Sequence, residues 1–286
     1  MARELGWPDA PEALPRPVID SHTHLDVHDR SLHGDEAPDA EALLAWAAEA
    51  GVPQVVQIGC DVKSAEWSVP FARSHPNVAV GVALHPNDAA RIGVRQGRAA
   101  LEAAWDRIDD LARDPVVRAV GETGLDYFRT PEPEGQAVQH ESFRWHIDLA
   151  KELDKTLVIH DRDSHDDVIS VLLDQGAPER VVFHCFSGDA QMARVCAEHG
   201  WFMSFAGVIT FGSAEELREA LRVVPGDLLL VETDAPYLTP KPNRGRVNAT
   251  YLMPWTVRRM AQERGEDLDE LCDALVANTY RAFGQW

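Results

Sequence analysis

The residues of this sequence that could do chemistry are histidines and carboxylates of the kinds that bind metal ions. Two of them, His22 and His24, directly follow the apolar residues Val18 and Ile19. Side chains two apart on a strand point to the same face, so this pair can hold one metal ion if the segment is extended. Four more such residues follow other apolar runs, namely Glu122, His160, His184 and Asp234. The pattern predicts a metal site.

The chemistry of these six side chains favours a centre with more than one divalent ion. Mixed imidazole and carboxylate ligation suits Zn²⁺, Mn²⁺ or Fe²⁺, and suits Mg²⁺ less well. Six ligands exceed a single four-coordinate site, so we expect two ions about 3.5–4 Å apart, with Glu122 able to bridge them through its two oxygens. Such ions lower the pKa of a bound water toward neutrality, and Asp234 could accept its proton. Hydrolysis is the implied class of reaction.

Taken singly, each of these residues also has an ordinary structural interpretation. Two histidines at this spacing arise readily by chance, Glu122 could lie in a turn, and a lone histidine such as His160 is more often part of a core. We expect Cys185 to pack, because alternation points it away from His184. The prediction therefore depends on the recurrence of these residues at the ends of successive apolar runs.

Strands alternating with helices must position these residues. We expect strands near 17–22, 54–59, 78–84, 116–121, 156–160, 180–184, 201–205 and 228–233, with helices between them such as 39–50, 99–112, 139–153, 164–173, 190–199 and 214–223. This alternation implies a parallel sheet, and eight units in about 250 residues are typical of a closed α/β barrel of the TIM type, (β/α)8. A doubly wound open sheet is the alternative. The barrel is favoured because only a ring of strands brings so many strand ends together.

The composition is that of an ordinary globular protein and excludes a fibrous or disordered chain. The sequence has 286 residues, 45% of them hydrophobic and 26% charged. Its four scattered cysteines fit a reducing compartment, so we expect a cytoplasmic protein. Residues 1–16 lack the apolar stretch of a signal peptide and are expected to form an N-terminal extension, with a single barrel domain over 17–286. No run approaches the ~18 apolar residues of a membrane span.

The net charge of −20 argues against a polyanionic ligand, but one stretch is an exception. Residues 235–262 contain no Asp or Glu and carry Lys241, Arg244, Arg246, Arg258 and Arg259. In barrels the loops after strands seven and eight often form a phosphate site, and the first three of these residues fall in the loop after strand eight. We expect Arg244 and Arg246 to hold phosphate, and Arg258 and Arg259 to lie on an outer helix.

Six ordered motifs give the chain a resemblance to a known family. They are D-x-H-x-H-L-D at 20–26, L-H-P at 84–86, G-E-T-G-L-D-Y at 121–127, I-H-D-R at 159–162, H-C-F-S-G at 184–188, and E-T-D-A-P-Y-L at 232–238 running into N-R-G-R-V-N at 243–248. Together they resemble the TatD-type metal-dependent nucleases of the amidohydrolase-like barrel superfamily. The resemblance covers nearly everything from Val18 onward.

The resemblance implies a fold, a ligand set and an activity. It implies a TIM-type barrel in which His22, His24, Glu122 and Asp234 hold one divalent ion, while Glu122, His160 and His184 hold a second. It further implies hydrolysis of phosphodiester bonds in DNA, with two ions of Mg²⁺, Mn²⁺ or Zn²⁺.

Several residues near the predicted ligands could bind a substrate. Arg162 shares a face with His160, and Tyr127, Phe128 and Tyr237 could stack on exposed bases. A deoxyribonuclease acting on single strands or ends is the leading hypothesis, with nucleic acid as the partner and no membrane. The same activated water could instead attack an ester, amide or lactone, including the aminoacyl bond of a charged transfer RNA. A metal-binding scaffold without catalysis is a third hypothesis, opposed by the presence of all six ligands.

Overall fold

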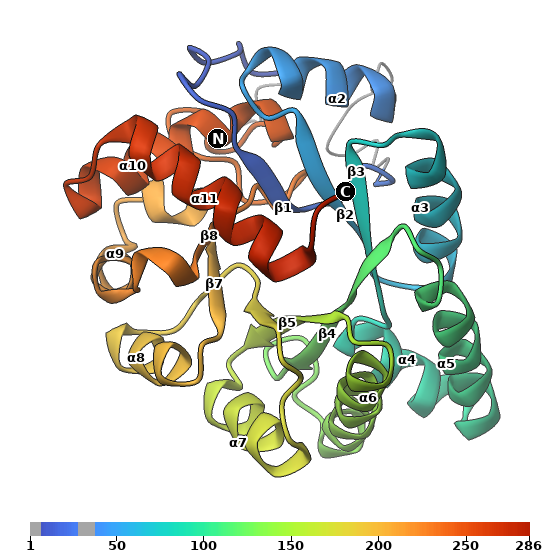
Figure 1. Ribbon diagram of the computed structural model, residues 1–286. Helices are drawn as coiled ribbons and strands as arrows, with labels where there is room; N and C mark the ends of the chain where they lie inside the picture. The colour runs from blue at the N-terminus through green and yellow to red at the C-terminus, as the bar shows by residue number, and fades with distance from the viewer. Residues whose placement is uncertain (1–6, 28–37) are drawn as a thin grey trace. The chain divides into compact units, whose positions relative to one another are not determined.

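The computed structural model describes residues 7–27 and 38–286, in which strands and helices alternate along the chain (Figure 1). The strands belong to one sheet whose order follows the chain from β1 to β8, and the recorded pairings are parallel. Their bounds are β1 Ile19–Thr23, β2 Gln54–Gly59, β3 Val78–Val82, β4 Val117–Asp126, β5 Thr156–Arg162, β6 Val181–Phe183, β7 Phe202–Phe205 and β8 Leu229–Val231.

The helices lie between and after the strands. The α-helices are α2 Ala40–Glu49, α3 Val62–Ser74, α4 Pro86–Gln96, α5 Arg98–Ala112, α6 Pro133–Glu152, α7 His165–Gln175, α8 Ala190–Glu198, α9 Glu215–Val223, α10 Met253–Arg264 and α11 Leu268–Phe283. The described residues also contain three short 3-10 helices, η1 Gly207–Thr210, η2 Gly226–Leu228 and η3 Thr250–Leu252.

The helices and strands form two compact units, and the second of them consists of residues 58–187 and 282–286. In this unit β3, β4, β5 and β6 pair in register, for example Val82 with Val120 and Ile159 with Phe183. Helices α3 to α7 lie outside these strands (Figure 1). The strand side chains between them are buried, and they form the apolar core that holds the carboxyl ends of the strands in place.

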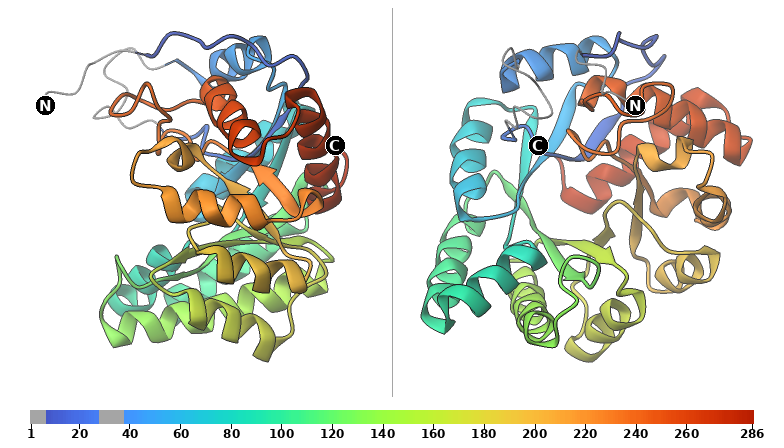
Figure 2. Two further views of the ribbon diagram at one scale, coloured as in Figure 1. Left: turned by 90° about the vertical axis from the view of Figure 1, so that its left-hand side faces the viewer. Right: turned by 180° about the vertical axis from the view of Figure 1, so that it is seen from behind.

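The first unit consists of residues 1–57 and 188–281. Here β7 pairs with β8, and β8 lies beside β1, because Ser21 donates a hydrogen bond from Oγ to the Val231 carbonyl at 2.9 Å. The gold to red helices of this unit lie on the outside of its strands (Figure 2). The chain that precedes β1 is also packed: Leu14 donates its N–H to the Ala50 carbonyl at 3.1 Å.

The fold class predicted from the sequence is confirmed: this is a (β/α)8 barrel fold with parallel strands in chain order. Two boundaries differ in a way that matters for the site. β4 runs to Asp126, so Glu122 lies within the strand, while β8 ends at Val231, three residues before Asp234. Helices α3 and α4 lie outside the predicted helices, and α3 contains Pro70, a residue that ordinarily breaks helical patterns.

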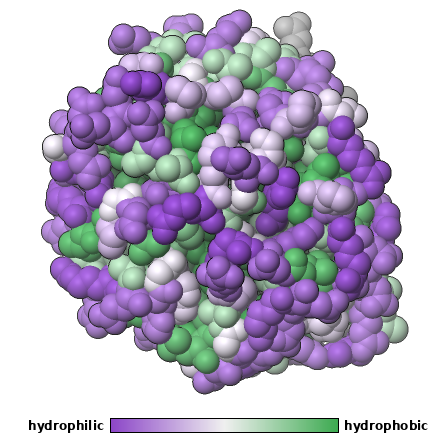
Figure 3. Space-filling model, in the orientation of Figure 1, coloured by the Kyte–Doolittle hydropathy of each residue, from purple (hydrophilic) through white to green (hydrophobic). Residues whose placement is uncertain are grey.

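One face of the protein surface is seen in Figure 3. The face in Figure 3 is mostly hydrophilic, with small separate hydrophobic areas. Within the described residues, no helix is both long enough and apolar enough to cross a membrane.

Candidate metal centre

In the second unit, Glu122 lies at the centre of a cluster of imidazoles. Its Oε1 lies 2.6 Å from Nδ1 of His160, 2.9 Å from Nε2 of His184 and 3.6 Å from Nε2 of His85. Cys60 donates from Sγ to the other oxygen, Oε2, at 3.4 Å. The carboxylate is 4% exposed. The structure thus brings Glu122, His160 and His184 together, as the sequence predicts.

Two glycines of the G-E-T-G motif allow β4 to approach β5 closely enough to form this cluster. A Cβ at Gly121 would lie 2.5 Å from Cβ of Val158, and a Cβ at Gly124 would lie 2.0 Å from the His160 carbonyl oxygen. Gly124 also has a φ of 140°, which residues with a side chain rarely adopt. The register of the two strands shifts between Val120 and Thr123, so a bulge positions Glu122.

His85 and Asp126 belong to the same cluster and were not predicted as site residues. His85 precedes α4, where its Nδ1 accepts the Asn87 N–H at 3.2 Å and its Nε2 is directed at Glu122. Asp126 Oδ2 lies 3.2 Å from Nε2 of His160. One nitrogen each of His85 and His160 and one oxygen of Glu122 lie within 4.8 Å of one another. The position of His85 just after the third apolar run was a signal that could have identified it.

The cluster concentrates negative charge beside imidazoles. Burial alone would raise the pKa of Glu122, but His184, His85 and His160 hold it well below its usual value. Burial would likewise lower the pKa of His160, yet its hydrogen bonds to Asp126 and Glu122 raise it to about 9. Burial and the neighbouring His160 lower the pKa of His85 to about 3. The carboxylates therefore require a positive charge between them, which a proton on His160 or a metal ion can supply.

In the first unit, β1 and the segment after β8 bring the other predicted ligands together. His24 Nε2 lies 3.3 Å from Oδ1 of Asp234, and the rings of His22 and His24 meet edge to face at 5.0 Å. The backbones are joined as well, because Asp234 donates its N–H to the His22 carbonyl at 3.0 Å. Asp234 has a φ of 52°, an uncommon conformation that this pairing stabilises.

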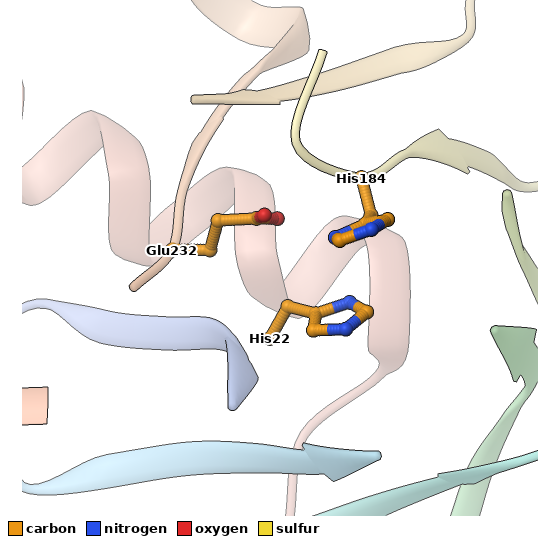
Figure 4. A group of neighbouring side chains, drawn as sticks. All are labelled: His22, His184 and Glu232. Carbon is orange, nitrogen blue, oxygen red and sulfur yellow. The ribbon is translucent and has the colours of Figure 1, made fainter. Parts of the chain in front are cut away.

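Glu232 is a further buried carboxylate of this unit. One of its oxygens lies within 4.8 Å of an imidazole nitrogen of His22. Figure 4 shows the side chain of Glu232 just beyond β8 and the imidazole of His22 on β1. Glu232 is fully buried, and a buried carboxylate requires a compensating partner.

Asp20 supports this set without contributing a ligand. Its Oδ1 accepts the N–H of Thr233 at 2.9 Å, and its Oδ2 accepts the Thr233 hydroxyl at 2.5 Å. Burial raises the pKa of Asp20 to about 7, although these hydrogen bonds act in the opposite direction. The D-x-H-x-H motif therefore combines two ligand-type histidines with an aspartate that joins β1 to the chain after β8.

The donors in each unit fit divalent metal ions. The second unit offers imidazole nitrogens around a carboxylate oxygen, and the first offers two imidazoles with the Asp234 and Glu232 carboxylates. Such mixtures of neutral nitrogen and anionic oxygen are typical ligands of Zn²⁺, Mn²⁺ and Fe²⁺.

Comparison with known proteins identifies the family. The model of the family described as TatD related DNase matches residues 19–284. The chain belongs to the TatD-related DNase family. The matched region includes strands and helices of both units.

Relatives in the TatD family share most of the chain. An uncharacterized metal-dependent hydrolase, TatD, of Mycobacterium tuberculosis is 43% identical over 270 residues, covering 93% of this chain and 98% of that protein. The 3'-5' ssDNA/RNA exonuclease TatD of Escherichia coli is 34% identical over 262 residues, covering 87% and 94%. A crystal structure of the TatD homolog YJJV from Escherichia coli matches with a TM-score of 0.82 at 27% identity, covering 93% and 97%. The chain is thus a metal-dependent hydrolase of the TatD family.

The four substrate residues predicted for this TatD-family chain lie in different surroundings. The Arg162 guanidinium stacks on the exposed ring of Phe128 at 4.0 Å, and Arg244 stacks on Phe211 at 4.3 Å. Arg246, by contrast, donates from Nη2 to the Trp7 carbonyl at 2.6 Å.

Tyr127 is also held by protein groups. Its hydroxyl donates to Asp167 at 2.5 Å and lies 2.7 Å from Nε2 of His140. Arg162 and Arg244 are thus presented at the surface, whereas Arg246 and Tyr127 have partners within the protein.

Proposed function

We propose that this chain is a metal-dependent nuclease that hydrolyses phosphodiester bonds in DNA, acting on single strands or their ends. The observation that carries the proposal is the buried Glu122 carboxylate with three imidazole nitrogens within 3.6 Å. Family members from Escherichia coli and Salmonella typhimurium that are 34% and 33% identical to the chain are 3'-5' ssDNA/RNA exonucleases. These relatives support the same class of substrate for this chain.

We further propose a metal centre in which the predicted ligands hold two divalent ions. In a (β/α)8 fold functional residues come from the carboxyl-terminal parts of the strands and the loops that follow them, and each of the six predicted ligands lies in the second half of a strand or within three residues after one. His22, His24, Glu122 and Asp234 would hold one ion, and Glu122, His160 and His184 the other. His85 and Asp126 would support the second set by holding Glu122 and His160 in position.

The protein groups supply the proton transfer and the positioning. When bound, divalent ions provide Lewis acidity and make a water molecule easier to deprotonate. The Asp234 carboxylate is the group we assign to accept that proton, because its side chain is 14% exposed and next to His24. Glu122 contacts Nδ1 of His160 and Asp126 contacts Nε2, so the two carboxylates fix the orientation of the imidazole ring.

Arginine and aromatic side chains would bind the strand. The guanidinium of Arg162 can hold phosphate oxygens in a bidentate fork, and Phe128 beneath it orients that group. Tyr237 is 47% exposed and its ring lies 6.1 Å from that of His24, so a base could stack on it beside the proposed centre.

The ligand role of Glu122 is tested by Glu122→Gln, which keeps the shape of the side chain and removes its charge. We expect hydrolysis of a labelled single-stranded oligonucleotide to fall at least about a hundredfold and metal content to fall with it. Glu134→Gln on the exposed start of α6 is the matched control and should keep full activity. Wild-type activity of Glu122→Gln after metal stripping and reloading would refute the assignment.

The substrate is tested by assaying one preparation against single-stranded DNA, double-stranded DNA, RNA and simple carboxylic esters. We expect single-stranded DNA to have the highest kcat/KM. Turnover of esters with none of the nucleic acids would overturn the nuclease proposal and favour hydrolysis of a carbonyl substrate.

A further inference from the structure

A basic pocket lies in the first unit beside the loops that follow β7 and β8. Its volume is about 440 Å³, within the range of about 300–1,000 Å³ typical of small-ligand sites. Its walls come from η1, from the loop after β8 and from α10, a helix that packs on η1. The cationic side chains that line it are Arg218, Lys241, Arg258 and Arg259. We call it the α10 pocket.

The positive charge of the α10 pocket is only partly neutralised. Glu215 pairs with Arg218 at 2.7 Å, and Glu263 pairs with Arg259 and lies 3.7 Å from Arg218. No acidic residue is among those that line the pocket. Arg258 donates to the carbonyls of residues 12 and 13, which leaves its charge unpaired by these contacts. A protein with a net charge of −20 therefore keeps a local excess of cations here.

Two buried donors in this wall lack an acceptor. Among the described residues, no atom accepts a hydrogen bond from Nε1 of Trp255 or from Nε of Arg259. These residues are four apart on α10 and so lie on the same face of the helix. A buried donor without an acceptor is costly, so this face of α10 is suited to an anion that offers several oxygens.

The pocket is held in shape by hydrogen bonds that do not use these donors. Arg218 donates from Nη1 to the carbonyls of Ile209 at 3.0 Å and Phe211 at 2.7 Å. The hydroxyl of Thr210 accepts the Lys241 N–H at 2.8 Å, which joins the loop after β8 to η1. A site whose walls are fixed in advance loses less free energy on ordering when a ligand binds.

We propose that the α10 pocket is a second phosphate site, which holds a backbone phosphate of the strand that the proposed metal centre cuts. This inference rests on the proposed function. Phosphate fits because it carries several acceptor oxygens and a negative charge that Lys241 can balance. A strand fits because a further cation, Arg244, stacks on Phe211, a residue that lines the pocket.

The chain connection also limits how far this site lies from the metal ligands. Lys241 follows Asp234 by seven residues, which places their Cα atoms within roughly 25 Å of each other. One strand can therefore contact both places, and the pocket would hold a part of the strand away from the bond that is cut.

The test follows the indole N–H signals of the eight tryptophans by NMR in the full-length protein. Trp255→Phe removes one signal and thereby assigns it, while keeping an aromatic ring in place. We expect inorganic phosphate, thymidine monophosphate and an oligothymidylate without terminal phosphates each to shift the Trp255 signal, because each offers acceptor oxygens to Nε1. A Trp255 signal that none of the three probes moves would overturn the proposal.

Binding affinity gives the second readout. Lys241→Gln should weaken phosphate binding about tenfold, the effect of losing one charge-assisted contact. Lys63→Gln, the same change at an exposed position on α3 outside the pocket, should leave the affinity unchanged. Equal weakening by both variants would mean general electrostatic attraction and would overturn the proposal.

Hydrolysis assays distinguish a phosphate site in the α10 pocket from the nuclease activity itself. We expect Lys241→Gln to raise KM for a long oligothymidylate with little change in kcat, and to leave the turnover of a dinucleotide unaffected. Oligonucleotide hydrolysis with an unchanged KM in Lys241→Gln would overturn the pocket and leave the nuclease intact. A shifted Trp255 signal in a protein that cleaves no nucleic acid would support a phosphate site and overturn the nuclease.

Discussion

The residues around Glu122 show how a single carboxylate can organise a site. Three histidines and a cysteine thiol are directed at its two oxygens, and each comes from a different part of the second unit. His85 is the member that extends the predicted set. Its ring is 15% exposed, and its low pKa keeps it neutral, which suits a ligand or a hydrogen-bonding partner of Glu122.

We therefore predict that His85→Ala weakens metal binding and activity by about ten- to a hundredfold, the usual effect of losing a group that orients metal ligands. Metal content after equilibrium dialysis and kcat for an oligonucleotide would measure the two effects. His75→Ala at the end of α3 is the matched control, since His75 stacks on Phe71 away from this cluster. A His85→Ala protein with normal metal affinity would show that the histidine is only a structural neighbour.

His165 offers a residue-level test by pH. Its Nδ1 lies 2.6 Å from Oδ2 of Asp161, and this hydrogen bond raises the pKa of His165 although partial burial opposes the rise. The protonated form is thus favoured in the folded state. Its contribution to stability is fully present below the unfolded value near 6.5 and is lost as the pH rises through the higher folded pKa.

We expect His165→Gln to have a lower urea midpoint than the wild type below pH 6.5. The two curves should converge at alkaline pH. A constant difference over the whole range would show that the loss comes from packing and not from the ion pair.

At the scale of elements, β4 and β5 form the part of the fold on which the site most depends. The sequence predicts both strands, but it ends β4 at 121, because the polar residues and glycines that follow read as a turn. In the structure these residues remain in the strand, and the two glycines allow it to lie against His160. The sequence pattern could not show this, since the close approach depends on a strand more than thirty residues away.

We predict that Gly124→Ala destabilises the protein by more than about 3 kcal/mol, because its Cβ would overlap the His160 carbonyl and its φ is positive. Gly176→Ala is the matched control: it also has a positive φ, but no atom lies within 4 Å of the added Cβ. The free energy of unfolding of that variant should fall by only about 1–2 kcal/mol. Urea unfolding of both proteins measures the difference, and equal losses would contradict a packing role for Gly124.

At the scale of the whole molecule, the fold class could be predicted from the sequence, whereas the surroundings of the basic residues could not. Alternating apolar runs and helical segments are local patterns, so they predict the barrel. Arg218 was not predicted at all, because its role depends on where α9 packs. Arg246, predicted to bind phosphate, donates a hydrogen bond to the Trp7 carbonyl, a pairing 239 residues apart that no local pattern encodes.

The overall charge leads to a prediction about salt. Each phosphate contact to a single strand contributes a slope of about −0.7 to the dependence of log K on log salt, so contacts from Arg162, Lys241 and Arg244 would give about −2. Lys241→Gln should reduce this slope by about 0.7, as measured by oligonucleotide binding over a series of salt concentrations. An affinity that increases with salt would mean that repulsion from the net charge of −20 dominates, and would contradict these contacts.

The segment that precedes β1 has a consequence for any shortened form of the protein. Its backbone carbonyls at Trp7, Glu12 and Ala13 accept hydrogen bonds from Arg246 and Arg258, and Pro8 accepts one from the Tyr251 hydroxyl. A protein trimmed to begin at residue 17 would lose these acceptors and expose the guanidinium groups of Arg246 and Arg258, the second of which lines the α10 pocket. We therefore expect the trimmed protein to bind nucleic acid nonspecifically through these arginines. Nucleic acid that copurifies with it would be the first sign.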